Sequence, residues 1–101
     1  MNTIKIGGVV YSIKMQDRLE DNGEVVWGLS NFGDAMIEIR SELNPQKTNQ
    51  TIIHECVHIM LHEAGLDEET YDERLVTALG NMLYQTIIDN SAFIKRIEME
   101  K

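Results

Sequence analysis

One apolar helical segment constrains the fold of this chain more than any other feature. From about residue 48 to Glu63 the apolar residues recur at helical spacing and form an unusually wide face. The members of this face are Ile53, Val57, Met60, Leu61 and Ala64, extended by Ile52, Cys56 and Ile59. A helix with so much apolar surface is covered on several sides, so we expect it at the centre of the fold.

The ends of this helix carry recognisable boundary signals. Asn44-Pro45 breaks the preceding segment and permits a helix start, and Thr48 or Asn49 is the N-cap we expect. Gly65 follows the last apolar position, where a glycine suits the C′ residue that ends a helix.

Strand patterns fill the chain before the helix. Three segments have this character: residues 3–14, 24–30 and 35–41. Gly7-Gly8 predicts a bulge or bend in the first segment, and Asn22-Gly23 predicts a hairpin turn before the second. In the third, Ile37 and Ile39 point to one face and Met36, Glu38 and Arg40 to the other, which suits a half-buried strand such as an edge strand.

Two more helices follow the central one. The first runs from about Thr70 to Asp89, and its expected buried stripe is Leu75, Val76, Leu79, Met82, Leu83 and Ile87. A short last helix carries Phe93, Ile94 and Ile97 on one side. The expected fold is α+β: a single domain over residues 1–101, with a small three-stranded sheet packed on the central helix and on a second, antiparallel helix.

Composition narrows the class of protein. The chain has 101 residues, enough for one core, and a formal net charge of −8 with no basic cluster, so we expect no direct nucleic-acid binding. Cys56 is the one cysteine, which excludes an internal disulfide. We see no signal peptide and no apolar run of membrane-spanning length, and expect a cytoplasmic protein without membrane contact. The oligomeric state stays open.

The central helix carries one narrow polar stripe that predicts a metal site. His54 and His58 are four residues apart and project from the same face, so both imidazoles can bind one zinc ion (Zn²⁺) at about 2.0–2.1 Å. Glu55 can reach a water bound to that ion, whose pKa the metal lowers towards about 7. The pattern indicates a hydrolytic site in which Glu55 is the general base.

Two neighbours of the motif have other expected roles. His62 lies about 12 Å along the helix axis from His54, too far to share one ion, and suits the last turn of the helix or a supporting contact. Cys56 points away from the histidines and is expected in the core.

Catalytic zinc usually has a third protein ligand besides water, and Glu73 is our choice. Acidic candidates after Gly65 are Asp67, Glu68, Glu69, Asp72 and Glu73. Glu73 heads an inward stripe that includes Gly80, a residue that a close helix crossing would explain. The competing reading is a capping box over residues 70–73, with Asp72 or Glu69 as ligand instead.

Residues 51–62, Thr-Ile-Ile-His-Glu-Cys-Val-His-Ile-Met-Leu-His, resemble the motif helix of the ImmA/IrrE family. These are small gluzincin-type zinc metallopeptidases, common in phages and mobile elements, with a zincin-like fold. The resemblance spans roughly residues 28–85 and implies that His54 and His58 are ligands and Glu55 the catalyst. Glu73 with Ala78 matches the spacing of the family's third-ligand helix, although Arg74-Leu75 replaces its usual Ala-Asn.

The resemblance also implies a substrate: a specific, often regulatory, protein or peptide. In zincins the strand before the motif helix pairs with the substrate, which points to residues 36–40 as the receiving edge. An equally good reading is that Glu38 and Arg40 protect a free edge from aggregation. Tyr71 and Tyr84 are weaker candidates for oxyanion donors.

The sequence therefore predicts a zinc metallo-endopeptidase. The alternative is a non-catalytic zincin-like module that binds metal and a protein partner. Glu55 favours the enzyme, because a purely structural zinc site needs no acid beside its first ligand.

Overall fold

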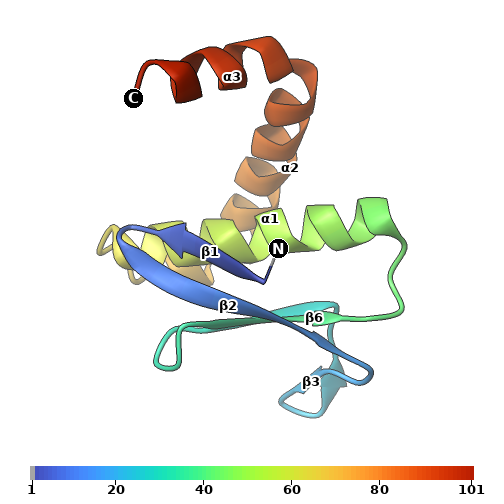
Figure 1. Cartoon of the computed structure of the whole chain (residues 1–101). Coiled ribbons are helices and arrows are strands. Elements are labelled where there is room, and N and C mark those ends of the chain that lie inside the picture. The colour runs from blue at the N-terminus through green and yellow to red at the C-terminus, as the bar shows by residue number, and fades with distance from the viewer. Residues whose placement is uncertain (1) are drawn as a thin grey trace.

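A computed structural model describes residues 2–101, in which all the strands come before the helices along the chain (Figure 1). The strands are β1 (Thr3–Ile6), β2 (Val9–Gln16), β3 (Glu20–Asp21), β4 (Glu24–Val25), β5 (Gly28–Asn31) and β6 (Met36–Arg40). The helices are α1 (Pro45–Glu63), the short 3-10 turn η1 (Glu69–Tyr71), α2 (Glu73–Asp89) and α3 (Ser91–Met99). The predicted α+β class is confirmed.

The main sheet has four strands rather than three, in the order β1-β2-β6-β5. The segment 3–14 is a hairpin of two strands, because Gly7 and Gly8 both take positive φ and turn the chain between β1 and β2. The predicted turn at Asn22-Gly23 is present and joins a separate small ribbon, β3–β4. The segment 24–30 is consequently divided between β4 and β5.

The expectation that residues 36–40 form an edge strand is wrong. β6 lies inside the sheet, parallel to β2 on one side and antiparallel to β5 on the other. The edge beside α1 is β5, whose register places Gly28 opposite Ile39 and Ser30 opposite Ile37. The alternation of β6 is as predicted, since Ile37 and Ile39 are fully buried.

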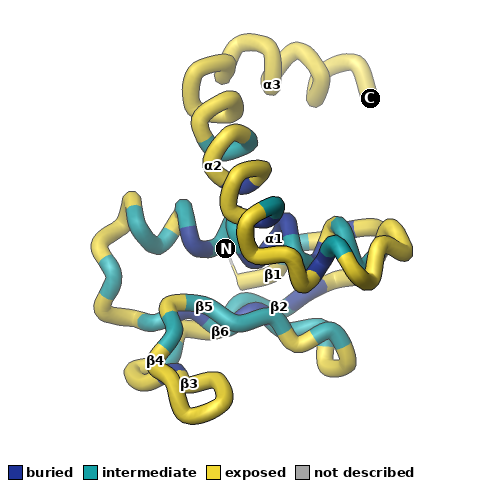
Figure 2. Tube along the Cα trace, turned by 180° about the vertical axis from the view of Figure 1, so that it is seen from behind, coloured by how far each residue is buried: buried dark blue, intermediate teal, exposed yellow. Residues whose placement is uncertain are grey.

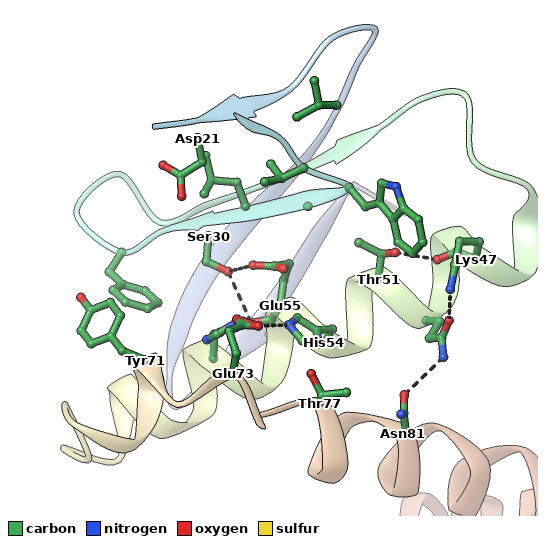
Figure 3. A pocket seen from close by; sticks show the side chains of 18 residues that line it. Asp21, Ser30, Lys47, Thr51, His54, Glu55, Tyr71, Glu73, Thr77 and Asn81 are labelled. Carbon is green, nitrogen blue, oxygen red and sulfur yellow. Dashed lines mark hydrogen bonds and ion pairs between the residues drawn. The ribbon is translucent and has the colours of Figure 1, made fainter. Parts of the chain in front are cut away.

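Helix α1 lies between the sheet and α2 (Figures 1 and 3). It begins earlier than expected: Asn44 is the N-cap, its side chain accepts a hydrogen bond from the Lys47 amide, and Pro45 occupies the first turn. The core forms where α1 meets the sheet, around Tyr11, Ile37, Ile39, Cys56 and Ile59. Met60, expected on the buried face, is 43% exposed because that side of α1 turns away from both layers.

Helix α2 packs on α1 over its first half alone. Glu73 contacts His58 while Asn81 contacts Gln50, so the two helices run in opposite directions where they touch. Val76 and Gly80 are the buried residues of α2. The rest of the predicted stripe is confirmed only in part. Leu75 and Leu83 are half-buried, whereas Leu79, Met82 and Ile87 are exposed, and no layer covers the second half of α2 (Figure 2). No helix within residues 2–101 is long and apolar enough to cross a membrane.

Two glycines that face α1 are expected to respond in opposite directions to an added methyl group. A Cβ at Gly28 would lie 2.7 Å from Thr51 Cγ2, whereas a Cβ at Gly80 would lie 3.5 Å from His54 Cα, an ordinary contact distance. Gly28→Ala should lower the free energy of unfolding by about 1–3 kcal/mol through overpacking. Gly80→Ala should raise it by about 0.5–1 kcal/mol through helix propensity. Urea unfolding of both variants tests this, and a destabilised Gly80→Ala would contradict the described helix crossing.

Candidate metal centre

A cleft of about 950 Å³ opens between β5, α1 and the start of α2 (Figure 3). The small β3–β4 ribbon and the segment after it contribute Asp21, Val25, Val26 and Trp27 to its wall. The floor carries the polar stripe of α1, with His54, Glu55 and His58. The motif predicted from sequence therefore faces an open cleft rather than the core.

Glu73 joins the two histidines from the first turn of α2. Its two carboxylate oxygens lie 3.2 Å from His54 Nε2 and 2.7 Å from His58 Nε2. One ligand atom from each of the three residues lies within 4.8 Å of the other two. The predicted ligand set His54, His58 and Glu73 is thus brought together from two helices.

The donor set fits a zinc ion. Tetrahedral zinc with bonds of about 2.0–2.1 Å holds its ligand atoms about 3.3 Å apart, close to the separations seen here. Two imidazoles and one carboxylate form a three-ligand set known from catalytic zinc sites, which keep one position for water or substrate. His54, His58 and Glu73 thus form a group that could hold a metal ion.

The imidazole ring of His58 is held in place by Thr70, which contacts Nδ1, the ring nitrogen that does not face Glu73. His58 Nδ1 lies 2.5 Å from the Thr70 carbonyl oxygen, and the Thr70 hydroxyl donates to the His58 carbonyl at 2.5 Å. Donation of Nδ1–H to a carbonyl leaves Nε2 unprotonated and available as a ligand. Thr70, which is fully buried, therefore holds His58 in the tautomer that metal binding requires.

Glu55 is buried at 6% exposure and does not belong to the ligand group. Its Oε1 accepts a hydrogen bond of 2.7 Å from the Ser30 hydroxyl on β5. Burial raises the pKa of the Glu55 carboxyl, and the charge of Glu73 adds to this, while the Ser30 hydrogen bond and the two histidines oppose it. The result is a carboxyl beside the ligands that binds protons more readily than an exposed one.

The other acidic candidates have different roles. Asp72 is the N-cap of α2, and its side chain accepts from the Leu75 amide. The capping box considered as the alternative is absent: α2 begins at Glu73 rather than Thr70, and the Glu73 carboxylate points to the histidines. Glu69 lies in η1, and neither it nor Asp67 joins the ligand group.

His62 lies outside the ligand group, as expected from its distance along the helix. Its ring stacks on Phe32 with centroids 4.0 Å apart, and its Nδ1 lies 3.7 Å from Asp67. Of the two tyrosines considered, Tyr71 lines the cleft and Tyr84 does not. Cys56 is in the core, 1% exposed, and burial raises the pKa of its thiol to about 11.

Two residues of the site were not predicted from the sequence. Ser30 reaches Glu55 because of the β5 register, a long-range feature without a local signal. The sequence predicts Thr70 at the start of the second helix, whereas the structure places it before that helix, with its hydroxyl and carbonyl both hydrogen-bonded to His58. No local sequence signal distinguishes Thr70 from an exposed threonine near a helix start.

Thr70→Val is expected to weaken the binding of a metal ion such as Zn²⁺ about tenfold, because groups that orient a metal ligand typically contribute this much. The hydroxyl that ties residue 70 to the His58 carbonyl is lost, and about 1 kcal/mol of stability with it. Thr77→Val is the matched control, since Thr77 is an exposed cleft residue of α2. Competition with a chromophoric chelator measures both affinities; equal values would show that Thr70 does not support the site.

Comparison with known proteins found no match: no protein-family model, curated protein or solved structure is similar to the chain. The site therefore has to be interpreted from its own residues.

Proposed function

We propose that this chain is a zinc metallopeptidase that hydrolyses a peptide bond in a protein or peptide substrate. The observation that carries the proposal is the meeting of His54, His58 and Glu73 beside a buried carboxylate, Glu55, in an open cleft. A structural zinc site is closed by protein ligands and needs no such acid. The motif resemblance of residues 51–62 to ImmA/IrrE metallopeptidases agrees with this function.

His54, His58 and Glu73 would hold the ion, which supplies Lewis acidity towards water and a substrate carbonyl when bound. Glu55 is the proton carrier. Its Oε1 is fixed by Ser30, while its Oε2 makes no hydrogen bond within residues 2–101 and is not sealed from solvent. Glu55 would take a proton from the attacking water and return it to the leaving amine.

The position of Glu55 suits both halves of this cycle, because its carboxylate lies beside the ligand group and is held by Ser30. Ser30 keeps the carboxylate aimed along β5 in either state, because a hydroxyl can donate to it or accept from it.

The substrate would pair with β5 rather than with residues 36–40. β5 is a sheet edge, and Gly28, Leu29 and Ser30 line the cleft above the ligands. An extended peptide added to this edge gains main-chain hydrogen bonds and lies across Glu55. Trp27 and Phe32 flank the strand and offer apolar contacts to substrate side chains.

The test is a cleavage assay on a peptide library, read by mass spectrometry, with zinc-loaded and chelator-treated protein. We expect cuts at internal peptide bonds that appear with zinc and vanish with the chelator. Identical peptide patterns in both samples, together with full zinc occupancy, would contradict a peptidase and favour a metal-binding interaction module.

A further inference from the structure

The C-terminal part of the chain forms an arm that stands clear of the rest of the molecule (Figures 1 and 2). We define the arm as residues 82–101, the second half of α2 together with α3. None of its residues is buried. Its exposed apolar side chains are Met82, Ile87, Ile88, Phe93, Ile94, Ile97 and Met99.

The helices of the arm need a further packing partner to be stable. Helix α3 has nine residues, and isolated helices shorter than about 12–15 residues are marginal in water. Phe93, Ile94 and Ile97 are 57%, 39% and 52% exposed and form one side of this helix. A contiguous apolar face of this kind on a short helix marks an interaction surface.

The charge distribution separates the arm from the body. The arm has three basic residues and three acidic ones, so its formal charge is zero. The whole net charge of −8 therefore lies in residues 2–81. Two copies of the chain repel each other through their bodies but not through their arms.

We propose that the arm is a homodimer interface, in which the arms of two copies pack on each other about a twofold axis. Such an interface is self-complementary. In a parallel pair of α3 helices related by a twofold axis that runs along them, the flank of one copy that carries Arg96 meets the flank of the other that carries Glu98, and the apolar sides meet. Each arm thus offers a second arm both an apolar surface and side chains of opposite charge.

The same charge distribution argues against other binding partners of the arm. A basic partner would be drawn to the acidic body rather than to the neutral arm. A membrane surface is bound by helices with a basic polar face, but Lys95 and Arg96 are balanced by Glu98 and Glu100, and the acidic body is repelled by anionic lipid. The dimer leaves the metal site free, because every residue that lines the cleft precedes the arm.

The test is the mass of the chain in solution, measured by light scattering and by sedimentation over a hundredfold range of concentration. The disrupting variant is Phe93→Glu with Ile97→Glu. The control, Ser91→Glu with Ala92→Glu, adds the same charge to exposed positions at the start of α3, off the apolar side. Protection of the buried Cys56 thiol from a thiol reagent shows that each variant is folded.

We expect twice the chain mass for the wild type and the control, and the single chain mass for the disrupting variant. A second measurement uses Ile97→Cys, which should give a disulfide-linked dimer on mild oxidation, whereas Ala92→Cys should not. A wild type that is monomeric throughout, or a dimer that survives Phe93→Glu with Ile97→Glu, would overturn the proposal. Flotation of that monomer with phosphatidylcholine vesicles would assign the arm to lipid; no flotation would leave a different protein as its partner.

Discussion

Glu55→Gln is expected to lower the rate of peptide hydrolysis by about 10²–10⁴-fold, the usual contribution of a general acid–base group, and to leave zinc binding intact. The amide keeps the size of the carboxyl and can still accept the Ser30 hydrogen bond, so the fold around β5 is preserved. It does not take up a proton from water at neutral pH. Turnover of a cleaved library peptide and zinc content are measured on the same sample.

Glu63→Gln is the matched control for this variant. Glu63 lies eight residues further along α1, and its carboxylate accepts a hydrogen bond from Tyr11 instead of facing the cleft. Its replacement should leave the hydrolysis rate within a few-fold of the wild type. Glu55→Gln protein that keeps both its zinc and its full rate would contradict the assignment of Glu55 and favour a non-catalytic module.

The second large effect concerns two histidines on one helix. His58→Ala should weaken zinc binding by more than the roughly 10–100-fold that follows loss of a supporting contact, because a direct ligand is removed. His62→Ala should leave the affinity unchanged, since His62 stacks on Phe32 away from the ligand group. Chelator competition on the two variants separates the roles.

The midpoint of thermal unfolding gives an independent test of the two variants His58→Ala and His62→Ala. A ligand that binds only the folded state raises the midpoint, so zinc should raise it for the wild type and His62→Ala but not for His58→Ala. An equal loss of affinity in both variants would mean that the ion is not held where His58 and Glu73 meet.

Local patterns were enough to predict much of this fold. The helical spacing around His54 predicted α1 and its central place, and the Asn22-Gly23 pair predicted a turn. Sheet order was beyond reach, because the parallel pairing of β2 with β6 joins segments far apart in sequence. For that reason the edge strand was assigned to residues 36–40 instead of β5.

The sequence overestimates burial along α2, where the apolar side of an amphipathic helix has no other element packed against it. Leu79, Met82 and Ile87 have the spacing of a core face, and a pattern shows which side of a helix is apolar without showing what covers it. In the site, spacing alone placed His54 and His58 together, and the inward stripe of α2 led to Glu73. The contacts from Ser30 and Thr70 depend on how strands and loops pack, so no local spacing predicted them.

The most direct test of the central claim is the metal content of the protein, measured by elemental analysis after purification without chelators. The account predicts about one zinc per chain in the wild type, and little or none in Glu73→Ala, whose carboxylate bridges both histidines in the structure. Absence of zinc from the wild type, even after incubation with the metal and dialysis, would contradict it.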